Sequence, residues 1–583
     1  MELSAIRHRP DYCECYAADN DTVVLLLQTG KDIDKAYVIC EDPFIDQLYR
    51  KEKWYGKRME MCERLELEHN YLWRVRIRPE YKRLQYYFEV EGCGKSYYVF
   101  ENRICPVEDK DKRSLQYFKF PWLNPGDVIR VPEFVRNTVW YQIMPDRFCR
   151  AKGTNTGERF MPWGESDPDH LRCSYGGNLK GIIERLDYIK SVGVNGIYLN
   201  PVFEAVSYHK YNTIDYTKID PDFGTNDDMK ELVKEAHARG IKVMLDGVFN
   251  HSGIKFRPWT DVLEKGKDSQ YYSWFFINTD DFRKGMESTG DGRYYSFSFS
   301  PSMPKLNTNN DEVIRYFTDI CLTWVREWDI DGIRFDVGDE VSHRFMAALH
   351  RALKAEKPDL FMLGEIWFDS IAWLNGTEYD SVMNYPLSNC LNDFFEHEDM
   401  TARELMYNIN SCFTMYPEQV TSGLFNFLDT HDTVRAFESC GGSTDILLQR
   451  LALLLFLPGT PCLYYGTELA LKGINKDDNR QCMPWDRIDS GYHKEFFAEV
   501  QKLIGLRGSD PLFTALSVNV LPDDQLPRLI HITKEENDRL IGIVINAGSS
   551  PVKQEQGYEI LYSNACEGST LLPGGTLIYR QTR

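Results

Sequence analysis

The segment Lys242-Val-Met-Leu-Asp246-Gly-Val-Phe-Asn250-His251 indicates the fold class of this 583-residue chain. A short apolar strand ends here in acidic and polar residues, and Gly332-Ile-Arg334-Phe-Asp336 repeats the pattern further along. Amphipathic stretches of helical length at 227–239 and 311–328 alternate with these strands. Such alternation is typical of α/β domains built on a parallel sheet.

The same alternation extends from about residue 133 to 505. A third amphipathic stretch lies at 341–356. Eight strand–helix units predict a (β/α)8 TIM barrel, with an open parallel sheet as the alternative. We expect an inserted domain at about 251–303, after the third strand. The predicted strands are 138–143, 196–199, 242–246, 332–336, 361–365, 381–384, 423–428 and 462–465.

Strand-like segments flank the barrel on both sides. Residues 1–120 predict an N-terminal β-sandwich, because short β-branched and aromatic runs are separated by polar or glycine-containing breaks. Its many aromatic residues either fill the space between two sheets or form a sugar-stacking face. A linker is expected at 121–132, and a C-terminal β-sandwich at 506–583. The expected strands are 22–28, 36–40, 71–77, 84–90, 96–100, 528–533, 540–546, 558–562 and 576–580.

Composition indicates which class of ligand the protein binds and in which cellular compartment it works. The net charge of −20 disfavours nucleic acid and anionic membrane surfaces as partners, whereas a neutral substrate fits it. The 15 cysteines are scattered without a CxxC pair, which is typical of buried thiols in a cytoplasmic protein. The N-terminus carries no apolar signal-like run, so we expect no export.

Acidic residues follow several predicted barrel strands, and barrel active sites lie at that carboxyl end. A single acid there is ordinarily a helix cap or a loop charge, but several converge on one cavity. Arg334 and Asp336 point to one side of a strand, so the guanidinium is expected to keep Asp336 ionised. Trp367 lies beside Glu365, and an apolar neighbour raises a carboxyl pKa. Two carboxylates with opposite pKa shifts suit glycoside hydrolysis.

Further polar residues are expected around the same sugar ring. Asp432 is predicted to hold sugar hydroxyls as charge develops, and His251 and His431 to donate hydrogen bonds. The two histidines lack an HxxxH or HxH spacing, so no metal site is predicted. The sequence also has no Walker-type phosphate loop.

These motifs resemble the α-amylase family of glycoside hydrolases. The ordered set is Asp246-Gly-Val-Phe-Asn250-His251, Gly332-Ile-Arg334-Phe-Asp336, Gly364-Glu365-Ile-Trp367 and Thr430-His431-Asp432. The resemblance implies that Asp336 is the nucleophile, Glu365 the acid/base and Asp432 the transition-state stabiliser. The substrate-binding residues that it implies, together with those expected above, are Tyr211, Asp246, Asn250, His251, Arg334, Trp367, Tyr385, His431 and Arg480.

Two features resemble the cyclomaltodextrinase, neopullulanase and maltogenic amylase group within that family. One is Met303-Pro304-Lys305-Leu306-Asn307, and the other is the N-terminal β domain. The resemblance implies a cytoplasmic enzyme acting on cyclodextrins and maltooligosaccharides, with transglycosylation. It also implies a homodimer in which one N-terminal domain narrows the partner's active-site cleft.

Some positions depart from the family pattern. Asn212 replaces an aspartate, Phe368 a histidine and Lys476 an acidic residue, which affects the expected donor-side preference. No cofactor is expected to be required. The oxygen ligands of the family's structural calcium are depleted, since the chain reads Cys149-Arg-Ala-Lys-Gly-Thr-Asn155 and Gly176-Gly177-Asn178, so a structural calcium is expected to bind weakly or not at all.

The sequence therefore predicts a retaining hydrolase of α-1,4 bonds in cyclodextrins and short maltodextrins, with pullulan as a further substrate. One alternative is an α-1,6-preferring or sucrose-type member of the family. Another is a non-catalytic maltodextrin-binding protein. The Asp336→Asn variant distinguishes an enzyme from a binding protein, because an enzyme loses turnover whereas a binding protein keeps its sugar affinity.

Overall fold

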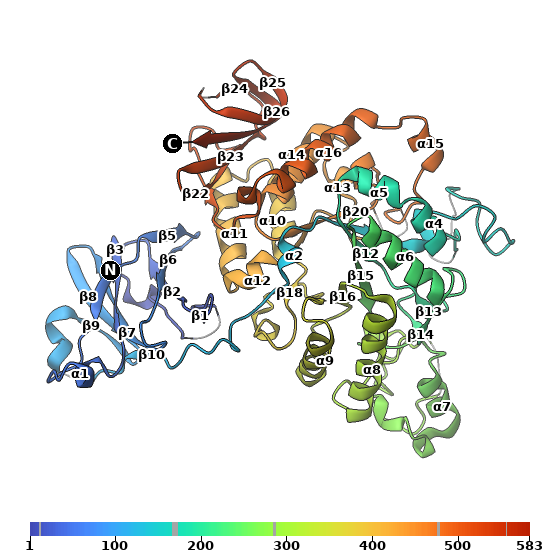
Figure 1. Cartoon of the computed structure of the whole chain (residues 1–583), viewed down its shortest axis with the longest axis horizontal. Coiled ribbons are helices and arrows are strands. Elements are labelled where there is room, and N and C mark those ends of the chain that lie inside the picture. The colour runs from blue at the N-terminus through green and yellow to red at the C-terminus, as the bar shows by residue number, and fades with distance from the viewer. Residues whose placement is uncertain are drawn as a thin grey trace. The chain divides into compact units, whose positions relative to one another are not determined.

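The computed structural model describes residues 1–10, 13–112, 114–165, 173–283, 287–474, 478–554 and 557–582 (Figure 1). The chain forms two compact units. The first contains Met1–Arg130 with two short later segments, Leu374–Gly376 and Met400–Thr421, and the second contains the remainder. The division after Arg130 falls within the expected linker. Among the described residues, no helix is long and apolar enough to cross a membrane.

The first unit is a sandwich of two antiparallel sheets, as expected. Leu25 of the first sheet shares one core with Val38 and Phe88 of the second, because alternate side chains of a strand point to the same face. The elements are β1 (Cys15–Ala17), β2 (Val23–Gly30), β3 (Lys35–Glu41), α1 (Ile45–Leu48), β4 (Lys57–Glu60), β5 (Glu63–Glu66), β6 (Asn70–Ile77), β7 (Leu84–Gly92), β8 (Lys95–Phe100), β9 (Arg103–Pro106) and β10 (Phe118–Phe120). The sheet orders are β1-β2-β6-β5 and β4-β3-β7-β8-β9, with β10 beside β7.

Aromatic residues of this unit mainly fill its core. Trp73, Tyr86, Phe88 and Phe118 are buried together between the sheets. This supports core packing over a sugar-stacking face for these four side chains. A smaller group of aromatic and aliphatic side chains near α1 stays exposed.

Two helices within the range expected for the barrel, 133–505, belong instead to the first unit. They are α11 (Ala402–Thr414) and most of α12 (Glu418–Ser422). The side-chain amide of Asn410 donates to the Glu66 carbonyl at 2.9 Å, and that of Gln419 donates to the Ala17 carbonyl at 2.7 Å. Both helices are amphipathic. Such a pattern predicts that one face of the helix is buried, but it does not identify the domain against which that face packs.

The second unit contains the (β/α)8 barrel. Its strands are β11 (Trp140–Ile143), β12 (Gly196–Leu199), β15 (Lys242–Gly247), β16 (Gly332–Phe335), β17 (Phe361–Gly364), β18 (Ser381–Val382), β19 (Phe425–Phe427) and β20 (Thr460–Tyr464). These eight described strands pair in parallel in the order β18-β17-β16-β15-β12-β11-β20-β19, and a parallel bridge between Met383 and Phe425 links the two ends. Figure 1 shows β12, β15 and β16 in the middle of this unit, with α6 (Asn226–Ala238), α8 (Asp311–Trp328) and α9 (His343–Glu356) outside them.

Side-chain caps fix where the barrel helices begin. Thr225 and Asp228 form a reciprocal capping box at α6, and Asn310 and Ser342 cap α8 and α9. These caps set the lengths of the loops that carry the site. The other helices of this unit are α2 (Glu133–Arg136), α3 (Pro145–Phe148), α4 (Leu179–Glu184), α5 (Leu186–Val192), α7 (Arg257–Lys265), α10 (Tyr385–Glu396), α13 (Ala436–Ser439), α14 (Thr444–Phe456), α15 (Trp485–Asp489) and α16 (Lys494–Ser509).

Two excursions at the carboxyl end of the strands shape the cleft. After β12, the antiparallel pair β13 (Phe203–Ala205) and β14 (Thr213–Ile219) holds the loop with Tyr211. The expected insertion lies between β15 and α8. Just after its expected end, Lys305 bridges to His251, and Leu306 bridges to Phe275 within the insertion.

The C-terminal strands form a β domain next to α14. They are β21 (Asn519–Val520), β22 (Leu529–Glu536), β23 (Arg539–Asn546), β24 (Val552–Lys553), β25 (Glu559–Glu567) and β26 (Thr570–Thr582). Where we expected a sandwich, hydrogen bonds join these six described strands into one antiparallel sheet. The side-chain amide of Gln449 on α14 donates to the carbonyls of Asn546 and Gly575 at 2.9 and 3.2 Å.

Candidate active site

A cleft of about 680 Å³ opens at the carboxyl end of the barrel strands. It brings together seven residues predicted from the sequence and five that were not. The predicted residues are Tyr211, His251, Asp336, Glu365, Trp367, Asp432 and Arg480. The additional residues are His209, Phe297, Met303, Val337 and Asp339.

Arg334 lies at the centre of the acidic cluster. It is fully buried on β16, and its Nη1 lies 2.9 Å from Oδ1 of both Asp246 and Asp336. Its Nη2 lies 2.8 Å from Oε1 of Glu365. Three carboxyl groups from three neighbouring strands therefore surround one guanidinium. The contact between Arg334 and Asp336 agrees with their predicted placement on one side of the strand.

Burial dominates the protonation of Asp336. It raises the pKa of Asp336 well above its ordinary value, while Arg334 lowers the pKa and Glu365 and Asp246 raise it further. This direction is opposite to the one expected from the sequence. The sequence shows the adjacent arginine, but it shows neither the burial nor the two other carboxyl groups that share the guanidinium.

Glu365 is held from several sides. The backbone N–H of Val337 donates to its Oε2 at 2.9 Å, and the Trp367 indole N–H and the Tyr385 hydroxyl lie 3.3 and 3.4 Å from Oε1. Val337 has a φ of 47°, which is a strained conformation for a β-branched residue. In this conformation the backbone N–H of Val337 points at the Glu365 carboxyl group. Trp367 stacks on Tyr385 with ring centroids 3.8 Å apart.

Asp432 belongs to a second network. Its Oδ1 accepts from Arg480 Nη2 at 3.1 Å, and its Oδ2 lies 3.0 Å from His431 Nε2. The Tyr211 hydroxyl lies 2.7 Å from the same histidine nitrogen and donates to Asp246 Oδ2 at 2.9 Å. The two networks therefore meet at Tyr211, whose ring stacks on His431 with an interplanar angle of 4°.

Predicted site residues that do not line the cleft lie directly behind its wall. They are Asp246, Asn250, Arg334, Tyr385 and His431, all at most 2% exposed. Their contacts hold the lining residues in place. Sequence reasoning missed two residues of this layer, Gln142 and Asn200, although both are polar residues at strand ends, the signal that identified Asp246.

The insertion supplies one wall of the cleft. Phe297 stacks on His251 with ring centroids 4.8 Å apart, and Lys305 binds Asn250 and lies 3.0 Å from Glu340 Oε2. Burial lowers the pKa of His251 to about 3, so its imidazole is neutral near pH 7.

Two of the three family departures lie in the described chain. The side-chain oxygen of Asn212 accepts from the hydroxyl of Ser207 at 2.6 Å. Phe368 is half exposed next to Trp367. Lys476 lies outside the described residues.

Asn155 lies in the segment where the resemblance places the calcium ligands. The side-chain amide of Asn155 donates to the carbonyls of Gly176 and Asp222 at 2.9 and 2.7 Å, and N–H donors repel a metal ion. The side-chain oxygen of Asn178 instead accepts from the N–H of Gly181 at 2.8 Å and caps α4. Within the described ranges, no group of three or more His, Cys, Asp or Glu residues could hold a metal ion.

Comparison with known proteins agrees with this geometry. The family described as "Alpha amylase, catalytic domain" matches residues 142–504, and "Alpha amylase, N-terminal ig-like domain" matches residues 1–124. A maltogenic alpha-amylase from Bacillus acidopullulyticus is 39% identical over 96% of this chain and 94% of its own length. An intracellular maltogenic amylase from Bacillus subtilis (strain 168) is 38% identical over 87% of this chain and 84% of its own length.

A solved structure extends the likeness to the whole chain. The structure of a cyclomaltodextrinase superposes with a TM-score of 0.88 at 32% identity, covering 100% of this chain and 98% of the other. Sequence, fold and the arrangement of acidic residues all lead to one assignment. The chain belongs to the α-amylase family of glycoside hydrolases.

Proposed function

We propose that this protein is a retaining hydrolase of α-1,4-glucosidic bonds in cyclodextrins and short maltodextrins, with transglycosylation. The observation that carries the mechanism is the guanidinium of Arg334, which contacts Asp336 and Glu365 through its two terminal nitrogens. Two carboxyl groups that contact one guanidinium lie close together. The two catalytic carboxyl groups of a retaining glycosidase are likewise only about 5–5.5 Å apart.

In the proposed reaction, Asp336 attacks the anomeric carbon as a carboxylate, while the Glu365 carboxyl gives its proton to the leaving glycosidic oxygen. Glu365 then removes a proton from water or from an acceptor sugar, which releases the sugar from Asp336. The contact of Arg334 with Asp336 opposes the effect of burial and favours the carboxylate form that the attack requires.

Asp432 is the proposed stabiliser of the oxocarbenium-like transition state. Arg480 and His431 hold its two oxygens, so the carboxylate faces the cleft in a fixed orientation. Tyr211, His251, Trp367 and Arg480 supply the surface of the cleft that contacts sugar. The named activities of the relatives support this substrate class.

No cofactor is part of this proposal. The hydrogen bonds of Asn155 support folding of the calcium-site segment without a metal ion.

We also propose a cytoplasmic homodimer. Thiols such as Cys321, Cys412 and Cys462 are buried and free, which suits a reducing compartment, and one relative is named intracellular. In the N-terminal unit, Leu48 and Tyr49 are more than half exposed, and Arg83 stacks against both Phe44 and Trp122. Exposed apolar surfaces of this kind mark interfaces. We propose that a second copy of the chain covers the surface around Leu48 and Tyr49. Sedimentation of the Leu48→Glu variant as a dimer would contradict that assignment.

The substrate class is tested by initial rates on β-cyclodextrin, maltotriose, pullulan and soluble starch at matched concentration, with Asp336→Asn as the blank. We expect cyclodextrin and maltotriose to be cleaved faster than starch. Equal or faster starch cleavage would rule out a narrowed cleft. Activity no higher than the blank on all four substrates would favour the α-1,6 or sucrose-type alternative.

A further inference from the structure

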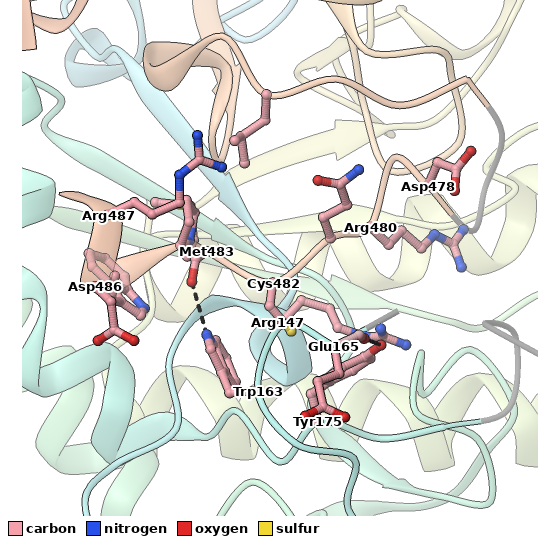
Figure 2. Close-up of a pocket in the computed structure, with 15 residues that line it drawn as sticks. Arg147, Trp163, Glu165, Tyr175, Asp478, Arg480, Cys482, Met483, Asp486 and Arg487 are labelled. Carbon is pink, nitrogen blue, oxygen red and sulfur yellow. Dashed lines mark hydrogen bonds between the residues drawn. The ribbon is translucent and has the colours of Figure 1, made fainter. Parts of the chain in front are cut away.

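Figure 2 shows a second pocket, of about 510 Å³. It lies between Trp163, Tyr175 and residues 478–487, and Arg147 of α3 also lines it. Arg480 lines both this pocket and the cleft. We refer to it as the Trp163 pocket.

Trp163 presents a fixed apolar surface in this pocket. The ring is half-buried, and its indole N–H donates to the carbonyl of Met483 at 2.9 Å (Figure 2). That hydrogen bond uses the only polar atom of the side chain. A ring held in this way loses little conformational entropy when an apolar face of a ligand packs against it.

The two buried arginines of the pocket are already neutralised. Arg147 Nε lies 2.8 Å from Asp146 Oδ2, and Arg147 also stacks on Tyr175. Arg480 donates to Asp432, to the Tyr208 hydroxyl and to the His431 carbonyl. Neither guanidinium is an open receptor for an anion.

The remaining lining groups suit a neutral ligand rich in hydroxyl groups. Glu165, Asp478, Asp486 and Arg487 carry mixed charge at the rim. The thiol of Cys482 has its pKa raised to about 12 by burial, so it is no nucleophile at neutral pH. An apolar platform surrounded by polar side chains of both signs matches a sugar ring, which has C–H faces and an equatorial rim of hydroxyls.

The strand order places this pocket across the barrel from the acid/base. In the closed order of eight strands, β20 lies opposite β16, and β11 lies opposite β17. Asp336 and Glu365 follow β16 and β17, whereas the Trp163 pocket is built after β11 and β20. Glu365 protonates the leaving oxygen in the proposed reaction, so the donor part of a glucan extends away from it, toward Arg480.

We propose that the Trp163 pocket binds a glucosyl unit of an α-glucan chain on the donor side, beyond Arg480. This inference rests on the proposed function and adds a subsite to it. Substrates long enough to reach the pocket gain binding from it, and maltotriose does not.

The test compares kcat/KM on maltoheptaose and maltotriose for the wild type, Trp163→Ala and Trp163→Phe. We expect Trp163→Ala to lower the maltoheptaose value about tenfold while the maltotriose value changes less than about twofold. Trp163→Phe keeps an aromatic face and should stay within about twofold on both. Tyr295→Ala is the matched control, because this exposed aromatic residue lines neither cavity.

An equal loss on both substrates, or no loss on either, would overturn the subsite. An inactive wild type would instead overturn the proposed function. If Trp163→Ala does not fold, hydrogen exchange of the inactive Asp336→Asn protein decides the matter. Maltoheptaose should slow exchange around Trp163 while maltotriose leaves it unchanged, and an identical response to both sugars would contradict the proposal.

Discussion

Nη1 of Arg334 lies 2.9 Å from Oδ1 of Asp336, and the same atom lies 2.9 Å from Oδ1 of Asp246. The only other terminal nitrogen of this side chain lies 2.8 Å from Glu365. One buried cation therefore compensates three carboxyl groups. The predictions for Arg334 and Asp336 follow from that imbalance of charge.

Replacing Arg334 by methionine should destabilise the protein strongly. Breaking a buried ion pair by removing one partner costs about 3–5 kcal/mol, and here the carboxyl groups of three residues lose their cation. Activity should fall at least about 100-fold. Urea denaturation and initial rates measure the two effects. The control is Arg326→Met at the exposed pair with Glu356, which should cost less than about 1 kcal/mol. Similar losses in the two variants would contradict the central role of Arg334.

Asp336→Asn should stabilise the protein at high pH. Because the pKa of Asp336 is raised by burial, the folded protein holds this proton more tightly than the unfolded chain, whose aspartates titrate near about 3.9. Ionising Asp336 therefore destabilises the folded protein, and this loss of stability grows as the pH rises above about 4. The Tm of Asp336→Asn should exceed that of the wild type at pH 8, and the difference should shrink toward pH 5.

Asp331→Asn is the control, because the pKa of Asp331 is shifted in the opposite direction to that of Asp336. Burial raises the pKa of Asp331, but hydrogen bonds from His237, Val243 and Lys242 outweigh it and lower the pKa to about 2. Its stabilising contribution is complete above the unfolded pKa and is lost only as the pH falls toward 2. Asp331→Asn should therefore lower Tm throughout pH 5–8. A Tm for Asp336→Asn that is below the wild type at pH 8 would refute the raised pKa.

Trp367→Ala should reduce transglycosylation more than hydrolysis. The ring is half exposed, lies beside Glu365 and stacks on Tyr385, so it is placed to hold an acceptor sugar. Loss of one aromatic contact corresponds to about a twofold to tenfold decrease in the transfer-to-hydrolysis ratio. Product analysis from maltotriose measures it. Trp367→Phe, which keeps the stacking surface but not the N–H, should retain most of the ratio. An unchanged ratio in Trp367→Ala would exclude this role.

Removal of calcium should leave the wild type unchanged. With EDTA, Tm and activity should equal those measured with added calcium, because Asn155 satisfies the carbonyls of Gly176 and Asp222. Asn155→Asp replaces those N–H donors by an anion facing two carbonyl oxygens, and should cost about 1–3 kcal/mol. Differential scanning calorimetry measures both proteins. A drop of several degrees in the Tm of the wild type with EDTA would show that this account of the segment is wrong.

The sequence predicted the parts of the fold whose signal is local. The helix at 311–328 is observed with the same bounds, and the strands carrying Asp246, Arg334 and Glu365 lie within a residue or two of their predicted positions. The helix is an amphipathic run capped by Asn310, and each strand is a short, mostly apolar run followed by polar residues. The domain assignment of residues 400–421 was not predicted, because an amphipathic face does not identify the surface that covers it.

The same distinction holds for the site. Asp336 and Arg334 are two residues apart on a strand, so their contact follows from the strand period. His209, Phe297 and Asp339 come from loops whose path depends on tertiary packing, and no short pattern marks them as lining the cleft. The raised pKa of Asp336 likewise depends on Asp246 and Glu365, which are distant in sequence.

The most direct test of the account is the identity of the residue that forms a covalent bond with the sugar. The protein is incubated with 5-fluoro-α-glucosyl fluoride, digested and mapped by mass spectrometry. The account predicts one fluoroglucosyl group, attached to Asp336, and none in Asp336→Asn. A label on another carboxyl group, or rapid turnover to an inverted product without a label, would contradict it.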